Sequence, residues 1–328
     1  MTTRPPVASR LRIATRKSQL ALWQAEHVAS LLRAAHPGIE IELVPLVTQG
    51  DRIQDRSLAA IGGKGLFIKE LEVAIEELRA DIAVHSMKDV PAELPPGLTI
   101  AAVLERADPR DALVTASGIK RLEDLPASAV VGTSSLRRQA QIRALRGDLR
   151  IEALRGNVDT RLRKLDTGAG GGVTADPLAG TRMDAIVLAS AGLIRLGLES
   201  RITARLDPSV CLPAVTQGVI GIECRESDAV TVEVLRALED TPTRKVMDAE
   251  RAFAARLGGS CQSPIAALAE LSGDKITLRG LVAEPDGSRL LRDTITGSAA
   301  DAKALGRQLA ERILAAGAGP LLERLRAS

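Results

Sequence analysis

The sequence is poor in aromatic residues: its 328 residues include two phenylalanines, one tryptophan and no tyrosine. Single-stranded nucleic acids are bound largely by stacking their bases on aromatic side chains, so this scarcity argues against that class of protein. The formal net charge at pH 7 is only +3, which is too small to suggest binding to a phosphate backbone. We therefore expect no nucleic-acid partner.

Cysteine and histidine are also scarce, with three residues of each. Cys211, Cys224 and Cys261 are odd in number and show no CxxC spacing, which argues against a disulfide framework and against a structural zinc site. The sequence therefore predicts no metal site of the cysteine–histidine type, while a metal held by carboxylates alone stays open.

Long apolar runs are absent as well. No stretch approaches the roughly eighteen apolar residues of a membrane-spanning helix, and the first ten residues, MTTRPPVASR, lack the apolar core of a secretory signal. Hydrophobic residues make up 45% and charged residues 26% of the chain, as in ordinary soluble proteins. We expect a cytoplasmic protein with no membrane partner.

Segments with the patterns of strands and helices alternate through the first two thirds of the chain, and the pattern restarts near residue 105. This βαβ rhythm is typical of three-layer α/β domains. Strands are expected at 11–16, 39–47, 81–86, 111–115, 129–135, 150–154, 184–190 and 219–225, and helices after Ser18, from Phe67 to Leu78, at 136–146 and at 157–165. The strand at 219–225 is expected to return to the first domain.

The last third has a different pattern: a helix at 243–257, a hairpin at 275–295 and a terminal helix, which together predict an α+β module. The fold class is thus α/β, with two three-layer α/β domains and a C-terminal α+β domain. The expected domains are residues 1–104 with 219–236, residues 105–218, and residues 237–328.

Basic and hydroxyl side chains recur at the expected junctions between strands and helices. In open α/β sheets, ligands bind beyond the carboxyl ends of the strands, where helix N-termini point their N–H groups outward. One arginine in a first helical turn is usually just solvated, but four such segments favour a site for a ligand with several carboxylates or phosphates. The segments are ATRKS, VHSMKDVP, GTSSLRRQ and LRGNVDTR, and they contain Arg16, Lys88, Asp89, Ser135, Arg137, Arg138, Arg155 and Arg161.

Asp89 is a carboxylate among these bases. It is either their counter-ion or a functional group that stabilises a cationic intermediate or accepts a proton. His85, on an apolar strand, is predicted to be a core residue rather than a catalyst. Lys64 lies in the glycine-rich stretch IGGKGLF, where it is either a solvated lysine or part of a mobile lid.

Cys261 stands in the glycine-rich turn GGSCQSP, an unusual place for a residue that normally packs in a core. Besides a small buried hydrophobe, it is a candidate for a reactive thiol, used as a catalytic nucleophile or as a point of covalent attachment. A nucleophile needs a positioned base, and none of the three histidines lies in a suitable segment. Attachment needs no such base, so the sequence favours an anchor.

Taken together, these segments resemble those of the porphobilinogen deaminase (hydroxymethylbilane synthase) family. Nine matches occur in the same order and cover nearly the whole chain. They are LRIATRKSQLALWQA, GGKGLFIKELE, DIAVHSMKDVP, ERADPRDALV, VGTSSLRRQAQ, LRGNVDTRLRKLD, LASAGLIRLGLESRI, LPAVTQGVIGIECR and GGSCQSPIA.

The resemblance implies a transferase of tetrapyrrole (porphyrin and heme) biosynthesis. Such an enzyme deaminates four molecules of porphobilinogen, its small-molecule partner, and joins them head to tail into hydroxymethylbilane. The product grows on a dipyrromethane cofactor tied by a thioether to a cysteine, here Cys261. The implied fold has two α/β domains like those of periplasmic binding proteins and a third, α+β domain, and the implied oligomeric state is a monomer.

The resemblance also implies roles for individual residues. Basic and hydroxyl side chains would bind the acetate and propionate groups of the pyrroles, and Lys64 would lie on the loop that covers the site. Asp89 would accept hydrogen bonds from pyrrole N–H groups and stabilise the positive azafulvene-type intermediate that forms as ammonia leaves. The implied cofactor ligands are Lys88, Ser135, Arg137, Arg138 and Arg155, and the implied substrate ligands are Arg16, Ser18, Arg161 and Arg195.

Three features depart from the family pattern. Ser260 precedes Cys261 where glycine is frequent, Thr216 replaces a usual glycine, and the glycine-rich segment 168–182 is an insertion. The insertion lacks the residue order of a phosphate-binding loop, so we expect a flexible surface loop there.

The residues alone leave a different class of function open: a non-catalytic anion-binding clamp or sensor domain of the periplasmic-binding-protein type. Such a protein would share the basic residues, but it would have no use for Cys261 or for the third domain.

Overall fold

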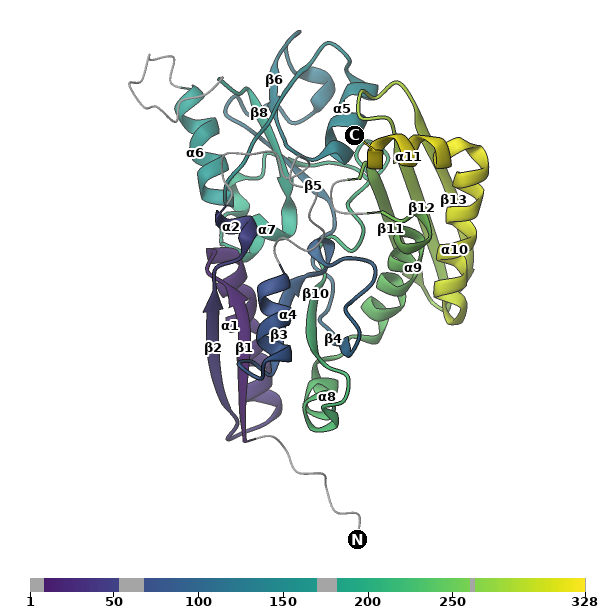
Figure 1. The fold of residues 1–328 in the computed structure, drawn as a ribbon. Helices are drawn as coiled ribbons and strands as arrows, with labels where there is room; N and C mark the ends of the chain where they lie inside the picture. The colour runs from purple at the N-terminus through teal and green to yellow at the C-terminus, as the bar shows by residue number, and fades with distance from the viewer. Residues whose placement is uncertain (1–8, 53–67, 170–181, 260–262, 328) are drawn as a thin grey trace. The chain divides into compact units, whose positions relative to one another are not determined.

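The computed structural model describes residues 9–52, 68–169, 182–259 and 263–327 (Figure 1). The chain divides into two compact units, one formed by Met1–Ala107 with Gly218–Lys245 and the other by Asp108–Gln217 with Val246–Ser328. Among the described residues, no helix is long and apolar enough to span a membrane.

The first unit is built on a five-stranded sheet. Its strands are β1 (Arg10–Arg16), β2 (Glu40–Leu46), β3 (Ile82–Ser86), β4 (Leu98–Val103) and β10 (Ile220–Arg225). Their order is β2-β1-β3-β10-β4. The strands β1, β2 and β3 run parallel, whereas β10 is antiparallel to both of its neighbours, so the returning chain makes the sheet mixed.

Helices cover both faces of this sheet. The helices α1 (Gln19–Ala35) and α8 (Ala229–Leu235) share a buried apolar cluster with one face, and α4 (Lys69–Glu76) shares another with the opposite face. The short helices α2 (Gln49–Arg52), η1 (Met87–Asp89) and η4 (Arg236–Leu238) complete the described part of the unit. The arrangement is a three-layer α/β domain.

The helix α1 illustrates why these residues form these elements. It begins where the Oγ of Ser18 accepts a hydrogen bond from the backbone N–H of Ala21 at 3.3 Å, which satisfies one of the unpaired donors of the first turn. Its inward face carries Val28 and Leu32, both completely buried. Each such burial stabilises the fold by roughly 1.5–3 kcal/mol. The helix expected after Ser18 is therefore confirmed.

The helix predicted to run from Phe67 to Leu78 is α4, but it ends at Glu76. Leu78 lies beyond that end, where its φ of 60° belongs to the left-handed region that commonly follows a helix, and it is 60% exposed. The prediction that Leu78 belongs to the buried helical face is wrong. Phe67 lies outside the described residues.

The second unit contains a second five-stranded sheet. Its strands are β5 (Asp111–Thr115), β6 (Val130–Gly132), β7 (Arg150–Glu152), β8 (Ala185–Ala189) and β9 (Ala204–Arg205). The order is β7-β6-β8-β5-β9, with β6, β7 and β8 parallel and β5 antiparallel to β8 and β9. The helix α5 (Leu136–Leu145) packs on one face, and α6 (Val158–Ala169) and α7 (Ser190–Arg195) pack on the other. The short helices η2 (Leu122–Asp124) and η3 (Glu199–Arg201) lie in its connections.

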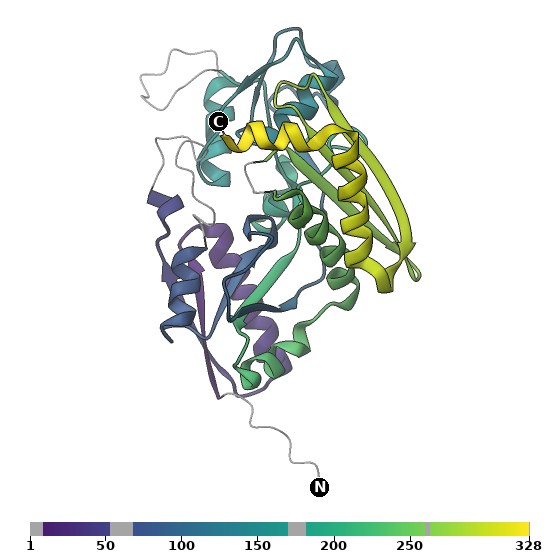
Figure 2. The same cartoon turned by 45° about the vertical axis from the view of Figure 1, so that its right-hand side comes forward.

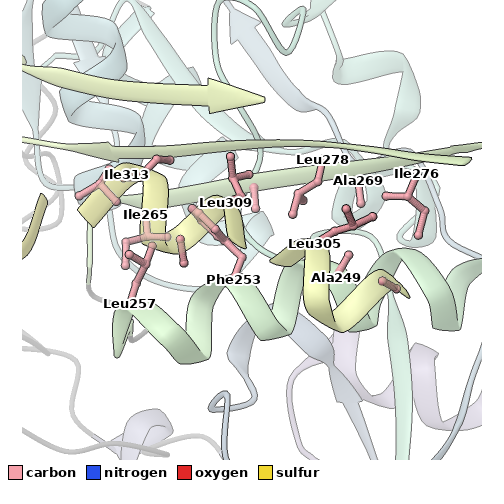
Figure 3. Packing of buried hydrophobic residues seen from close by; sticks show 14 of the residues in the cluster. Ala249, Phe253, Leu257, Ile265, Ala269, Ile276, Leu278, Leu305, Leu309 and Ile313 are labelled. Atoms are coloured by element: carbon pink, nitrogen blue, oxygen red, sulfur yellow. The ribbon is translucent and has the colours of Figure 1, made fainter. Parts of the chain in front are cut away.

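A three-stranded antiparallel sheet forms the rest of the second unit. It consists of β11 (Ile265–Ser272), β12 (Lys275–Ala283) and β13 (Leu290–Ser298) in that order. The helices α9 (Thr241–Leu257) and α10 (Ala302–Ile313) pack on one face (Figure 2). Phe253, completely buried, lies in the core between these helices and the sheet with Leu278 and Leu309 around it (Figure 3).

The opposite face of this small sheet packs on α5, through Ala140. Because Ile142 of the same helix belongs to the core of the five-stranded sheet, α5 is held from both sides within the second unit. The predicted fold class is confirmed: two three-layer α/β parts and a smaller C-terminal α+β part. The predicted domain boundaries stay a prediction.

The C-terminal helical segment is not one continuous helix. After η5 (Ala299–Asp301) and α10, a π-helical turn (η6, Leu314–Ala318) leads into α11 (Gly319–Ala327). Gly317 has a φ of 105°, which interrupts the helix. The terminal helix predicted from the sequence is therefore split in two.

Candidate active site

In the first unit, the carboxyl ends of β1 and β3 carry four of the predicted site residues. Arg16 is the last residue of β1, and Ser18 caps the helix that follows. Lys88 and Asp89 lie in η1, directly after β3. Since β1 and β3 are parallel neighbours, their carboxyl ends meet at one edge of the sheet, and the structure brings these four residues to that edge.

The turn that presents Asp89 is anchored at both ends. The Oγ of Ser86 accepts a hydrogen bond from Nε2 of Gln24 on α1 at 2.8 Å, and the backbone N–H of Val90 donates to the oxygen of Met87 at 3.2 Å. Met87 is buried, whereas Lys88 and Asp89 are partly exposed. The carboxylate of Asp89 is thus held on a fixed turn with access to a ligand.

His85 lies behind this turn and is 4% exposed. Its Nε2 is 2.8 Å from Oε2 of Glu223, which is completely buried on β10. Glu72 of α4 is near them, and burial together with the charge of Glu223 raises the pKa of Glu72 to about 7. The prediction that His85 is a core residue is confirmed.

In the second unit, α5 carries three predicted residues at its first turn. Ser135 is its N-cap, and its Oγ accepts from the backbone N–H of Arg138 at 3.5 Å. Arg137 and Arg138 are 3% and 6% exposed, so they are core residues and not part of a solvated face.

Both arginines bind a carboxylate that the sequence analysis did not single out, Asp111 at the start of β5. Nη1 of Arg137 is 2.7 Å from Oδ2 of Asp111, and Nη2 of Arg138 is 2.7 Å from Oδ1. Burial alone would raise the pKa of Asp111, but the charges of Arg137 and Arg138 hold it well below its usual range. The signal available in the sequence was an aspartate opening the apolar strand DALVT.

Two further groups donate to this carboxylate. Gln217 donates through Nε2 to Oδ1 of Asp111 at 2.9 Å, and the thiol of Cys211 donates to Oδ2 at 3.3 Å. The Nη1 of Arg137 also donates to the oxygen of Leu212 at 2.7 Å. Burial raises the pKa of the Cys211 thiol to about 12, so at neutral pH this cysteine is a protonated core residue.

The remaining predicted arginines lie in the second unit as well. Arg155 follows β7, whose carboxyl end lies at the same edge of the sheet as that of β6, the strand before Ser135. Arg161, in the first turn of α6, donates through Nε to the oxygen of Gly156 at 2.8 Å. Arg195 ends α7 and is 8% exposed, and this burial lowers its pKa to about 10.

Several predicted residues lie outside the described part of the chain: Lys64, Ser260, Cys261 and positions 170–181 of the insertion. In the sequence, Cys261 falls between the end of α9 and the start of β11. Within the described residues, no three histidine, cysteine or carboxylate side chains form a group that could hold a metal ion.

Comparison with known families decides the class of protein. The model of the porphobilinogen deaminase dipyrromethane cofactor-binding domain matches residues 11–233, and that of the porphobilinogen deaminase C-terminal domain matches residues 245–315. The chain belongs to the porphobilinogen deaminase family. The family's activity is that of a hydroxymethylbilane synthase, a transferase of tetrapyrrole biosynthesis whose substrate is porphobilinogen and whose cofactor is dipyrromethane.

Three solved structures of other proteins are similar to this chain, but with low sequence identity and low TM-scores. The methionine-binding protein MetQ is 11% identical, with 72% of this chain and 93% of that chain covered and a TM-score of 0.42. A marine metagenome TRAP solute-binding protein specific for aromatic acid ligands is 15% identical, with 98% and 97% covered and a TM-score of 0.41. The B. pertussis BvgS periplasmic domain is 13% identical, with 70% of this chain but only 40% of that chain covered and a TM-score of 0.37. At these TM-scores the matches carry no argument about function.

Proposed function

We propose that this chain carries out the family's reaction with Asp89 as its catalytic carboxylate and Cys261 as the point where the cofactor is attached. The observation that supports Asp89 best is its place on a fixed turn at the carboxyl end of β3, at the same sheet edge as Arg16 and beside Lys88.

The residues of the second unit have the chemistry that a dipyrromethane group needs. Its acetate and propionate groups require cationic hydrogen-bond donors, and guanidinium groups bind carboxylates in a planar, two-point fashion. The guanidinium groups of Arg137 and Arg138 share the single carboxylate of Asp111, so the pair keeps one net positive charge. Such a pair fits an anionic ligand, because a buried charge without a counter-ion is costly.

When bound, the cofactor supplies the pyrrole on which the product is built. Around it, Lys88, Ser135 and Arg155 join Arg137 and Arg138 in holding carboxylates, and Arg16, Ser18, Arg161 and Arg195 hold those of the substrate. Lys64, which lies outside the described residues, is expected to take part in covering the site.

Asp89 acts on the substrate itself. Its carboxylate accepts hydrogen bonds from pyrrole N–H groups and stabilises the positive charge that develops on the substrate as ammonia leaves. A fixed carboxylate in a partly desolvated site lowers such a barrier by roughly 3–4 kcal/mol. The proposal also includes a cytoplasmic monomer without nucleic-acid or membrane partners, and the domain division 1–104 with 219–236, 105–218 and 237–328.

The attachment is tested by the intact mass of the purified chain. The parent is expected to be heavier than its sequence by two pyrrole units, and Cys261→Ala is expected to have the mass of the bare polypeptide. A fully active parent without added mass would overturn the assignment of Cys261.

Asp89 is tested by Asp89→Asn, which keeps the shape of the side chain and removes its charge. This variant is expected to retain the covalent adduct and to lose turnover of porphobilinogen by at least about a hundredfold. Glu93→Gln, a neutralised exposed carboxylate four residues away, is the matched control and is expected to turn over normally. Turnover of Asp89→Asn close to that of the control would remove Asp89 from the catalytic role.

A further inference from the structure

The carboxylate of Asp111 is completely buried in the second unit, and four donors surround it. Oδ1 accepts from Arg138 at 2.7 Å and from Gln217 at 2.9 Å. Oδ2 accepts from Arg137 at 2.7 Å and from the Cys211 thiol at 3.3 Å. Because both oxygens are bonded on two sides, the orientation of the carboxylate is fixed.

Arg137 and Arg138 are consecutive residues of one helix. Side chains at i and i+1 point about 100° apart around a helix axis and do not face each other. In α5, the two guanidinium groups nevertheless converge, because each donates to a different oxygen of the same carboxylate. Asp111 therefore sets the relative position of the two cationic groups.

The charges in this cluster do not balance. Two guanidinium groups face one carboxylate, which leaves one positive charge in excess among buried side chains. An uncompensated buried charge is costly, so the cluster has the composition of a site that is completed by an anion.

We propose that Asp111 is a positioning residue, which holds Arg137 and Arg138 in the arrangement that binds a carboxylate of the dipyrromethane cofactor. This inference rests on the proposed function of the two arginines as cofactor ligands. Asp111 does not contact the cofactor itself. It acts through the two guanidinium groups, and its carboxylate neutralises only one of their two charges, so that the pair keeps its affinity for an anion.

The proposal and simple electrostatics predict opposite effects of removing the Asp111 carboxylate on the binding of an anion. If only charge mattered, removal of the Asp111 carboxylate would strengthen binding of an anion, because a nearby negative charge would disappear. If position matters more, its removal lets the guanidinium groups diverge and weakens binding. The amide of Asp111→Asn can accept through only one oxygen, and its NH2 group opposes the donors of the second arginine.

The experiment measures the fraction of folded chains that carry the covalent adduct, by intact mass, and KM and kcat for porphobilinogen on the loaded fraction. Asp111→Asn is expected to lower the ratio of loaded to unloaded chains at least about tenfold, because misplaced binding groups lose much of their contribution. Among loaded chains, KM is expected to stay within twofold of the parent value, since the proposal assigns Asp111 to the cofactor and not to the substrate.

Two controls separate position from stability. Asp108→Asn breaks another ion pair of the same unit, in which Asp108 binds Arg110 at 2.8 Å and Arg205 at 3.0 Å without contacting Arg137 or Arg138. Leu165→Ala destabilises the apolar core on the other face of the same sheet, whose cluster contains none of the residues that bind Asp111. Both control variants are expected to load normally when assayed well below their unfolding midpoints. Equal loss of adduct in Leu165→Ala would show that Asp111 has only a structural role.

Asp111→Glu is the second variant, for the case that Asp111→Asn does not fold. It keeps the buried charge but moves the carboxylate by one methylene, so it is expected to fold and to load less than the parent. Normal loading of either folded Asp111 variant overturns the proposal. Normal loading of Arg137→Gln and Arg138→Gln would instead overturn the proposed function of the arginines as cofactor ligands. The two sets of variants therefore distinguish a failure of the Asp111 proposal from a failure of the proposed function.

Discussion

At the scale of single residues, Thr216 holds a backbone conformation that residues with a branched Cβ rarely adopt, with a φ of 58°. The residue is 1% exposed, and its backbone N–H donates to Oε2 of Glu250 at 2.5 Å. That hydrogen bond holds the strained geometry in place. The family's usual glycine at this position would adopt it without steric cost.

Thr216→Gly is therefore expected to be more stable than Thr216→Ala. Both variants lose the buried hydroxyl and its hydrogen bond to the oxygen of Val215, but only glycine relieves the strain. This relief contributes about 1–3 kcal/mol, and the greater freedom of glycine in the unfolded chain offsets about 0.5–1 kcal/mol of it, so a difference of about 1 kcal/mol is expected. Urea unfolding of Thr216→Gly and Thr216→Ala checks this. Alanine keeps the positive φ and loses the hydroxyl, so it should bring no gain, and a stabilised Thr216→Ala together with an unchanged Thr216→Gly would contradict the argument.

Single residues also show where sequence reasoning stops. The arginines of GTSSLRRQ were predicted as ligands from their place at a strand–helix junction, and α5 does begin there. Their burial and their shared bond to Asp111 were not predictable, because residues 26 and 27 positions apart meet only through the tertiary fold. The spacing of apolar residues indicates whether a side chain lies on a buried face of its helix or strand. It does not indicate which residue that side chain contacts in the folded chain.

At the scale of elements, periodicity predicted most strands and helices and misplaced some ends. The helix at 243–257 is confirmed within α9 because its apolar positions repeat at helical spacing over four turns. Helical spacing did not predict the helix ends at Leu78 and Gly317. Each residue has a positive φ, which interrupts the helix at that point. The short elements β4, β9 and α8 were missed.

The turn between β12 and β13 shows how one element holds another. At Gly287, whose φ is 78°, an added Cβ would lie 2.6 Å from the backbone nitrogen of Ala144 and 2.8 Å from the oxygen of Ala140, both on α5. Nη1 of Arg143 donates to the oxygen of Pro285 in the same turn at 3.2 Å. The hairpin therefore packs its turn directly against the backbone of the helix that carries Arg137 and Arg138.

Gly287→Ala is expected to destabilise the chain by about 2–4 kcal/mol, because neither backbone can move away without disrupting its own hydrogen bonds. Gly273→Ala is the matched control: Gly273 also has a positive φ, of 60°, but nothing lies within 4 Å of an added Cβ. Its cost should be only about 1 kcal/mol. Denaturant midpoints measure the difference, and equal losses in the two variants would show that the turn does not press on α5.

At the scale of the whole molecule, the two units bury ionisable groups whose pKa values shift in opposite directions. In the second unit, the pKa of Asp111 is held below its usual value, so its contribution to stability is present above about pH 4 and is lost as the pH falls further. In the first unit, the pKa of Glu72 is raised from 4.5 to about 7. Its contribution is fully present below pH 4.5 and is lost as the pH rises through 7.

Glu72→Gln should therefore stabilise the first unit at pH 8 and change it little at pH 5. A shift of this size corresponds to an upper bound of about 3 kcal/mol, so a gain of about 1–3 kcal/mol is expected at pH 8. The single tryptophan, Trp23 on α1, lies in the first unit, so its fluorescence during urea unfolding follows that unit alone. Glu93→Gln, which neutralises an exposed carboxylate of the same unit, controls for net charge and should have no effect beyond about 0.5 kcal/mol. The prediction is contradicted if Glu72→Gln and the parent have the same midpoint of unfolding at pH 8. That result would show that the pKa of Glu72 is the same in the folded and the unfolded chain.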